Sequence, residues 1–250
     1  IVGLIEPDRG TICYDGRDIM SLDKKERLLM RQEIGMLFQN AALFDSMSVL
    51  ENVMFPLDMF STMTYNERVQ RARACLERVN LIEAQDKSPE ELSGGMQKRA
   101  AIARARAMKP KYLFCDETFD GLDPVMRDEI LDIFLDFMQD ENHAILFSSH
   151  ITSDIDKIAD YLTFIHDGEI LFSVTTDELL GEAGILKCSA EEAEALDAER
   201  DGLLRIRKNQ FGCEILVRNK EQLRMRHPDA VIDSVTTEAL MLFYARGDEV

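Results

Sequence analysis

The chain has 250 residues, of which 46% are hydrophobic, so it is long enough for one large domain, or for a domain with a small companion, around an ordinary apolar core. Its formal net charge of −18 disfavours a nucleic-acid partner, because the phosphate backbone would be repelled. No run of about eighteen apolar residues is present, so the sequence predicts no segment that spans a membrane.

The first predicted elements are a hairpin, a helix and a strand. Residues 1–10 read as the end of a helix followed by a turn, and residues 11–20 as a hairpin, because their central Asp-Gly pair suits a tight turn. A polar helix is predicted over 24–31 and an apolar strand over 33–38, directly before Gln39. Taken alone, a glutamine after a strand is most simply a solvated side chain.

Two further helices are predicted from capping boxes, in which Ser48 pairs with Glu51 and Thr64 with Glu67. The second helix is expected to continue to about Val79 with a charged face. The first helix has an apolar face that is most simply core, with a docking surface for a partner as the alternative. That face includes Phe44, Val49, Val53, Phe55 and Leu57.

Residues 92–99, Leu-Ser-Gly-Gly-Met-Gln-Lys-Arg, are predicted to form the start of a helix, and this helix N-terminus is suited to bind an anion. The two glycines allow the backbone to come close to another object, and the free N–H groups of a helix N-terminus attract negative charge. Met96, Ala100, Ala103 and Ala107 recur at helical spacing. The simpler alternative is an N-cap followed by an ordinary core helix.

Two carboxylates follow a short apolar strand in the middle of the chain. Residues 112–115 are Tyr-Leu-Phe-Cys, and Asp116 and Glu117 come directly after them. This is the pattern of a buried strand that delivers acids to the edge of a sheet. Together with the helix start and its basic side chains, the two acids indicate a site for phosphate and metal.

A second strand of this kind is predicted over 144–149 and leads into His150. Asp123 and Pro124, earlier in the chain, are suited to be the N-cap and first residue of a helix that continues to about Asp140. Open parallel sheets bind ligands just beyond the ends of their strands, where His150 is expected to lie. A lone histidine is otherwise more often structural or solvated.

The C-terminal part has a different pattern. A hairpin is predicted over 161–174, and from about Gly181 short strands alternate with polar helices. The pattern indicates a small α+β appendix without a catalytic set, with a structural or regulatory role. Its strands are expected over 185–188, 203–208 and 213–217, and its last helix over 237–246.

The segment from Leu92 to Ala105 matches L-S-G-G-x-Q-x-R-x-x-I-A-R-A, the signature of the ATP-binding-cassette (ABC) ATPases. The strand acids, a Gly-Leu-Asp-Pro loop and the histidine follow in the family's order, so the chain resembles this family. The resemblance implies an α/β, P-loop NTPase (RecA-like) core with a helical signature subdomain. We expect an ABC ATPase domain over 1–180, with the helical subdomain at about 40–106, and an accessory domain over 181–250.

The resemblance also implies a catalytic site. Asp116 would hold Mg²⁺, and Gln39 would contact the metal or the attacking water. Glu117 would polarise that water, and His150 would donate to the γ-phosphate. The residues expected to contact the nucleotide or the opposite subunit are Gln39, Ser93, Gly94, Gly95, Gln97 and Asp123.

The function implied by the resemblance is that of an ATP-binding and ATP-hydrolysing subunit of an ABC transporter. It would use ATP and Mg²⁺ to drive transport across the cytoplasmic membrane through integral membrane permease subunits. Two such ATPases, identical or different, would pair at the cytoplasmic face of the membrane, and residues 40–60 would receive the permease. Five scattered cysteines without metal-ligand spacing fit a reducing compartment and are interpreted as mostly buried thiols.

One motif of the family does not occur in these residues. The phosphate-binding loop, G-x-x-G-x-G-K-[ST], is absent from the printed sequence, and the family's order leads us to expect it just upstream of Ile1. A cassette protein of DNA repair or translation is disfavoured, because the sequence has neither a long coiled-coil insert nor tandem cassettes. An inactive fragment, or a chimera that cannot bind ATP normally, is the remaining alternative.

The resemblance differs between two parts of the chain. Residues 1–115 resemble the ATPases of Mce/Mla-type phospholipid-trafficking systems, most of all at 36–39 and 43–49. From Asp116 on, the chain is more similar to ATPases of drug and peptide exporters, although Thr118 stands where that family more often has proline. We therefore hypothesise a junction of two different ATPases near residues 115–118.

Overall fold

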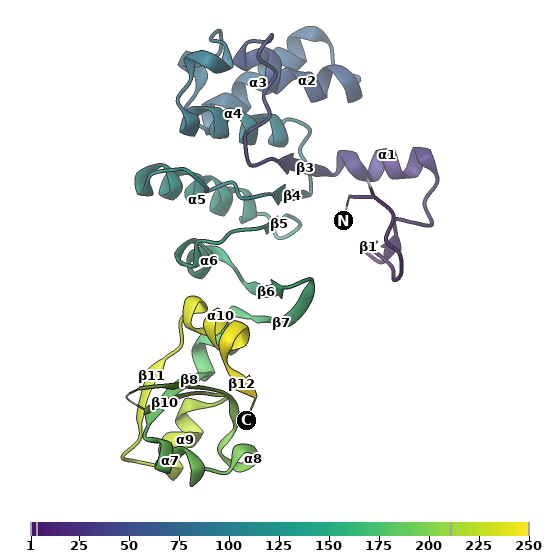
Figure 1. The fold of residues 1–250 in the computed structure, drawn as a ribbon. Coiled ribbons are helices and arrows are strands. Elements are labelled where there is room, and N and C mark those ends of the chain that lie inside the picture. The colour runs from purple at the N-terminus through teal and green to yellow at the C-terminus, as the bar shows by residue number, and fades with distance from the viewer. Residues whose placement is uncertain (1, 4, 211, 250) are drawn as a thin grey trace. The chain divides into compact units, whose positions relative to one another are not determined.

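A computed structural model describes residues 2–3, 5–210 and 212–249. The contacts within the chain divide it into two compact units, Ile1–His150 and Ile151–Val250. Figure 1 shows the elements of both, coloured by residue number. The sequence predicted that the ATPase domain ends at residue 180, and this boundary stays a prediction. The structural division falls earlier, between the last strand of the first unit and helix α6 (Thr152–Ile158).

The first unit is built on a three-stranded parallel sheet in the order β3-β4-β5. All three strands were predicted from their apolar runs. Leu37 pairs with Cys115, and Cys115 pairs with Phe147, so the three strands end level with one another. The side chains that follow them therefore meet at one edge. The strands are β3 (Ile34–Leu37), β4 (Tyr112–Cys115) and β5 (Ala144–Phe147).

Strand β5 differs from the prediction in its burial. Its apolar sequence predicted a buried strand, but exposed and half-buried residues alternate along it, and Leu146 is 50% exposed. Among the described residues β5 pairs with β4 alone, so it is the outer strand of this sheet. An apolar run shows that a strand can be buried, but it does not show how many neighbours cover it.

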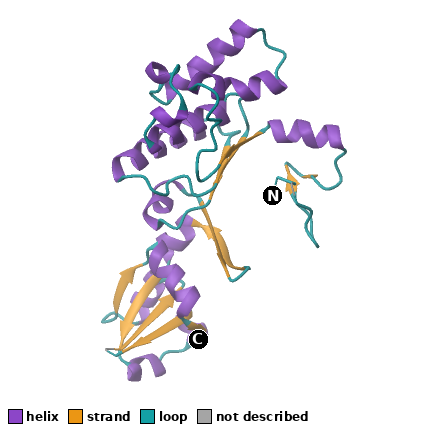
Figure 2. Cartoon of the chain, turned by 45° about the horizontal axis from the view of Figure 1, so that its top comes forward, coloured by secondary structure: helices purple, strands orange, loops and turns teal. Residues whose placement is uncertain are grey.

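Three helices pack together beside the sheet (Figure 2). Helices α2 (Val49–Phe60) and α3 (Tyr65–Arg78) begin at the two predicted capping boxes, and both reciprocal hydrogen-bond pairs are present. Helix α4 (Gly94–Arg106) begins at the N-cap Ser93, as predicted. Two short 3₁₀ helices, Ile82–Ala84 and Pro89–Glu91, connect α3 to α4.

The core of this helical group contains both apolar and polar side chains. Val49, Val53 and Leu57 of the predicted apolar face of α2 are at most 1% exposed, whereas Phe44 is 42% exposed. Asn52 is fully buried, and its amide accepts from the backbone N–H of Phe44 and donates to three carbonyl oxygens of the loop before α2. A single buried amide therefore fixes the shape of that loop.

The remaining elements of the first unit follow the predictions at their turns and caps. Asp15 and Gly16 both have positive φ, as a tight hairpin turn requires, between β1 (Cys13–Tyr14) and β2 (Arg17–Asp18). The described residues of the segment 1–10 form bends and contain no helix, so the predicted helix end is wrong there. Helices α1 (Lys24–Gln32) and α5 (Pro124–Met138) complete the unit.

The second unit contains α6, a hairpin and a five-stranded antiparallel sheet in the order β11-β8-β10-β9-β12. The hairpin of β6 (Tyr161–His166) and β7 (Glu169–Thr175) turns at Asp167 and Gly168, as predicted. A π-helix (Asp177–Glu182) follows it. The strands of the sheet are β8 (Gly184–Cys188), β9 (Leu203–Asn209), β10 (Gly212–Val217), β11 (Val231–Ser234) and β12 (Asp248–Glu249).

Four helices accompany this sheet. Side chains of α7, α8 and α9 pack into the apolar core of β8, β9, β10 and β11, while α10 packs on β9, where Arg205 lies 4.7 Å from the ring of Tyr244. The predicted strands and last helix of the appendix are confirmed, whereas β11 and β12 were not predicted. The helices are α7 (Ala190–Glu194), α8 (Ala198–Asp201), α9 (Lys220–Arg226) and α10 (Thr237–Arg246).

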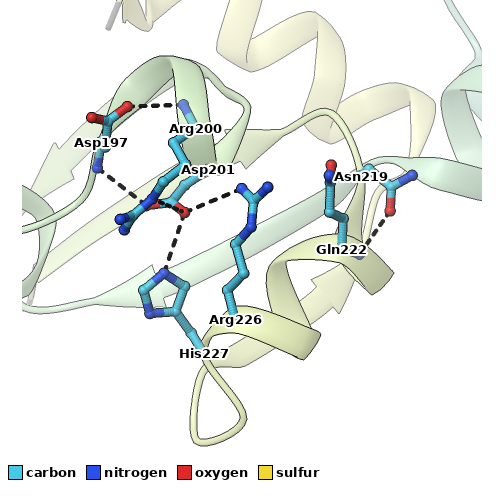
Figure 3. Close-up of polar contacts among 7 residues, drawn as sticks. All are labelled: Asp197, Arg200, Asp201, Asn219, Gln222, Arg226 and His227. Atoms are coloured by element: carbon cyan, nitrogen blue, oxygen red, sulfur yellow. Dashed lines mark hydrogen bonds and ion pairs between the residues drawn. The ribbon is translucent and has the colours of Figure 1, made fainter.

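A buried carboxylate ties α8 to the end of α9 in this unit (Figure 3). The Asp201 side chain is fully buried and lies 3.5 Å from Arg226 and 3.4 Å from the His227 ring. Asp201 also accepts from the backbone N–H of Asp197 and contacts Arg200. A buried charge of this kind is tolerated because several donors surround it.

The described residues include no helix that is both long enough and apolar enough to cross a membrane.

Candidate functional site

Gln39 and Glu117 meet at the edge of the sheet where β3 and β4 end. The side-chain Nε2 of Gln39 donates to Glu117 Oε2 at 2.7 Å and makes a longer contact of 3.4 Å to Asp120 Oδ2. The parallel register brings the two residues together, because Leu37 and Cys115 are paired and each strand is followed by its polar residues. The predicted glutamine therefore contacts the predicted base.

Asp116 is positioned by a serine that the sequence analysis did not select. The Oγ of Ser148 donates to Asp116 Oδ1 at 2.9 Å and accepts from the backbone N–H of Glu117 at 3.1 Å. Ser148 lies just beyond β5, opposite the two acids, and its own N–H donates to the Cys115 carbonyl at 2.9 Å. The signal was present in the sequence, because Ser148 is one of two serines at the end of the predicted strand before His150, but its partner depends on the strand register.

Glu117 opens a turn that is held in an unusual backbone conformation. Its φ is +43°, a left-handed value that costs a non-glycine residue roughly 1–3 kcal/mol. Phe119 in this turn is 1% exposed and packs edge-on against Phe134 and Phe147 at centroid distances of 5.6 and 6.0 Å. The buried ring anchors the turn to α5 and β5, and the carboxylate of Glu117 is left at the sheet edge.

Lys98 of helix α4 supports the same turn from the other side, and sequence reasoning did not select it either. Its ammonium group donates to the carbonyl oxygens of Glu117, Thr118 and Asp120 at 3.4, 2.6 and 2.9 Å. Burial lowers the pKa of Lys98, although the carboxylates of Asp120 and Glu117 oppose this effect. In the sequence, Lys98 is one of several basic residues of the helix, and nothing there distinguishes it.

His150 reaches the site through Asp120. Its Nε2 lies 3.9 Å from Asp120 Oδ1, and its side chain is 63% exposed. Asp120 is therefore shared between Gln39 on one side and His150 on the other. Cys115, next to the acids, is a core residue, as expected, and burial raises the pKa of its thiol.

The signature residues lie at the start of α4. Ser93 accepts from the backbone N–H of Met96 at 3.3 Å and is the N-cap of the helix. Gly94 is exposed, and a Cβ at this position would meet nothing within 4 Å. A Cβ on Gly95 would instead collide with Met126 of α5. One glycine therefore leaves space in front of the helix, and the other allows α5 to pack closely.

Gln97 and Asp123 have well-defined structural partners. The Nε2 of Gln97 donates to the Pro89 carbonyl at 2.9 Å, within the helical group. Asp123 caps α5 by accepting from the backbone N–H groups of Val125 and Met126 at 3.0 and 3.1 Å. The expected contacts of Gln97 and Asp123 with nucleotide or with the opposite subunit stay predictions.

The chemistry of this edge suits a hard divalent cation. Asp116 supplies a carboxylate oxygen and Gln39 an amide oxygen, which are ligand types that Mg²⁺ accepts, usually with water and phosphate oxygens as its other ligands. In the described part of the chain, no group of three or more His, Cys, Asp and Glu side chains is arranged to hold a metal ion by itself. The Ser148 hydroxyl engages Oδ1 of Asp116, and the hydrogen bonds of the described residues leave Oδ2 for another partner. These residues therefore fit the Mg²⁺ that accompanies a nucleotide.

Comparisons with known proteins agree with this geometry. The family model described as "ABC transporter" matches residues 1–120. The intermembrane phospholipid transport system ATP-binding protein MlaF of Haemophilus influenzae is 35% identical over 207 residues, covering 83% of this chain and 76% of that protein. The methionine import ATP-binding protein MetN of Carboxydothermus hydrogenoformans is 37% identical over 181 residues, covering 72% of this chain and 53% of that protein.

Solved structures show the same likeness. The dimeric post-hydrolysis state of the ATP-binding cassette MJ0796 bound to ADP and Pi has a TM-score of 0.64 at 28% identity, covering 70% of this chain and 77% of that one. CbiO1 of Clostridium perfringens, part of the ABC transporter complex cbiONQ, has a TM-score of 0.65 at 27% identity, covering 72% of each chain.

These findings bear on the alternatives left by the sequence. The 207 residues aligned with MlaF are more than either part of the chain contains, so that alignment crosses the hypothesised junction near residue 115. Nothing in the comparisons favours an inactive or chimeric chain, and the assignment of the two parts to two transporter groups stays a prediction. The predicted family and fold are confirmed. The chain belongs to the ATP-binding subunits of ABC transporters, a family of P-loop ATPases.

Proposed function

We propose that Gln39, Asp116 and Glu117 form the hydrolytic part of an ATP site in this chain. The observation that carries the proposal is the 2.7 Å hydrogen bond from Gln39 to Glu117, beside an Asp116 that Ser148 orients. A carboxylate base, a metal-binding carboxylate and an amide that can orient water are the groups that hydrolysis of a phosphoanhydride requires. Bound Mg²⁺ would neutralise charge on the phosphate oxygens.

Each residue has a distinct role in this proposal. Asp116 would hold Mg²⁺, directly or through water, and Gln39 would contact the metal or the attacking water. Glu117 accepts the proton of that water as the water attacks the γ-phosphorus. The bond from the γ-phosphorus to the β–γ bridging oxygen breaks and ADP leaves, while His150 donates a hydrogen bond to a γ-phosphate oxygen as negative charge builds there. Their arrival at one sheet edge from three parallel strands supports these assignments.

Ser93 and Gly94 act on the nucleotide held mainly by a second ATPase subunit. The exposed start of α4 supports this role, because its backbone N–H groups favour an anion and Gly94 leaves room for one. The cassette with ADP and Pi to which this chain is similar was solved as a dimer. Gly95, Gln97 and Asp123 complete the contacts between subunits by shaping α4 and α5.

The membrane partner of this subunit is a permease that docks on the helical group. Met59, Phe60, Met63 and Tyr65, at the end of α2 and the start of α3, are 60%, 44%, 37% and 65% exposed. Apolar side chains gathered at one place on a surface are typical of an interaction site. The subunit would work at the cytoplasmic face of the membrane, and the similar CbiO1 is part of an ABC transporter complex.

The substitution Glu117→Gln in the full-length subunit tests the assignment of the base. It keeps the shape and the hydrogen bond but removes the proton acceptor, so we expect ATP hydrolysis to fall by about 10²–10⁴-fold while ATP still binds. Glu141→Gln, at an exposed carboxylate of the same unit, is the matched control. Turnover close to that of the unmodified subunit would refute the role of Glu117.

A further inference from the structure

Helix α4 contacts the Glu117 turn through one buried cation. The Lys98 residue is 9% exposed, and its ammonium group lies within hydrogen-bond distance of three carbonyl oxygens in four consecutive residues, Glu117 to Asp120. An ammonium group has three donors and no acceptor, so these three carbonyls match its capacity. The backbone turn that carries Glu117 is thus wrapped around a side chain from the signature helix.

Neighbouring residues of α4 reinforce this contact on the same side of the helix. Gly95 packs directly on Met126, and Arg99 pairs with Glu129 at 3.4 Å, so α4 is also joined to the first turns of α5. Positions 95, 98 and 99 share one helical face because they are three and four residues apart. Helix α4 therefore contacts both the turn and the start of α5.

The other end of α4 holds the loop that follows Gln39. The guanidinium group of Arg104 donates to the carbonyls of Ala41 and Ala42 at 2.8 and 2.6 Å. Both alanines have positive φ, so this loop is also in a conformation that needs support. One helix thus holds both backbone segments that present the Gln39–Glu117 pair.

We propose that Lys98 is a positioning residue that couples the signature helix to Glu117 of the same chain. Its ammonium group holds the Glu117–Asp120 turn in the conformation that aims the carboxylate at Gln39. A displacement of α4, such as engagement of Ser93 and Gly94 with nucleotide would produce, moves the base of the same subunit. The proposal rests on the proposed function of Glu117.

The test uses Lys98→Met in the full-length subunit, because methionine keeps the volume but removes all three donors. We expect kcat for ATP hydrolysis to fall by about tenfold to hundredfold, since small misplacements of catalytic groups have effects of this size. The KM for ATP should change less than about threefold, because the ammonium group of Lys98 is engaged by backbone carbonyls of the turn. Lys87→Met, at an exposed lysine of the same unit, is the control and should leave both constants unchanged.

A second substitution separates positioning from folding. Lys98→Arg keeps a buried cation, but its planar fork cannot reach three carbonyls in the same way. We expect this variant to melt within a few degrees of the unmodified protein and still to lose kcat. If the Lys98→Met variant does not fold, the kcat of Lys98→Arg is the test of the proposal. An unchanged kcat in the folded arginine variant would overturn it.

Combination with Glu117→Gln distinguishes this inference from the proposed function. If Lys98 acts through Glu117, adding Lys98→Met to Glu117→Gln should lower single-turnover hydrolysis by less than about twofold, because coupled residues are not additive. Fully additive losses would overturn the positioning role while leaving Glu117 as the base. Unchanged hydrolysis in Glu117→Gln itself would instead overturn the proposed function.

Discussion

The amide of Gln39 donates to the carboxylate of Glu117 at 2.7 Å, although the two residues are 78 positions apart in the chain. Between them lies the whole helical group of α2, α3 and α4. The contact exists because β3 and β4 are parallel neighbours that end level with one another. The sheet's topology therefore connects the helical group to Glu117, the proposed base, and substitution of Gln39 tests this connection.

Gln39→Ala should reduce ATP hydrolysis by about tenfold or more, because the substitution removes the group that orients Glu117 and the expected contact to water or metal. ATP affinity should change much less, since the Gln39 amide is expected to contact the reacting phosphate and not the adenine or ribose of ATP. Steady-state kinetics on the full-length subunit measure both effects. Gln70→Ala, at an exposed glutamine of α3, is the control. Equal losses of affinity and rate would contradict a role in the chemical step.

Ser148→Ala should raise the Mg²⁺ concentration needed for half-maximal hydrolysis by about tenfold, a size typical of losing a partner that orients a metal ligand. The hydroxyl donates to Asp116 and accepts from the N–H of Glu117, so its removal loosens both acids. A Mg²⁺ titration of activity gives the measurement, with exposed Ser46→Ala as control. An unchanged Mg²⁺ dependence would show that Asp116 does not depend on Ser148.

The site residues that could be predicted are those that directly follow an apolar strand in the sequence. Gln39, Asp116 and His150 each follow such a run, and parallel strands bring their ends together. Ser148 could not be assigned a partner, because its contact depends on the register of β4 with β5. Lys98 could not be distinguished from other basic residues, because its role arises from a turn whose backbone conformation is set by buried packing.

The fold shows the same division between local and distant causes. Helix starts such as Ser48 and Thr64 were predictable, because a capping box involves residues only three positions apart. Strand β11 (Val231–Ser234) was missed, because its four residues alternate too briefly to give a pattern and it forms by pairing with β8. The exposure of β5 likewise depends on its position in the sheet.

Asn52→Ala should lower the free energy of unfolding of the first unit by about 2–3 kcal/mol, because it leaves buried carbonyl groups without a donor. The amide of Asn52 is fully buried and makes four hydrogen bonds to the backbone before and at the start of α2. The measurement is urea denaturation, monitored through the hydrogen exchange of α2 backbone amides. Asn66→Ala, at an exposed residue, is the control, and a loss below about 0.5 kcal/mol in Asn52→Ala would contradict this account.

The ionisation of Asp201 should make the second unit sensitive to acid. Burial raises the pKa of Asp201, but hydrogen bonds from the Asp197 backbone and from Arg200 and His227 outweigh burial, so the pKa lies below its ordinary value of 3.8. A folded-state pKa below the unfolded one contributes stability that is complete above the ordinary value. That contribution is lost as the pH falls through the lower, folded-state pKa.

Asp201→Asn should therefore destabilise the second unit at neutral pH, by about 3 kcal/mol if the loss resembles the breaking of a buried ion pair. It should also flatten the fall in stability below pH 3.8, because the titrating carboxylate is gone while Arg226 is left without its partner. Hydrogen exchange of β9 and β10 backbone amides, measured from neutral to acid pH, reports the stability of the second unit independently of the first. Asp229→Asn, an exposed aspartate beside His227, should keep the full acid dependence. An acid profile of Asp201→Asn that is parallel to that of the unmodified protein would show that other carboxylates control the stability of this unit.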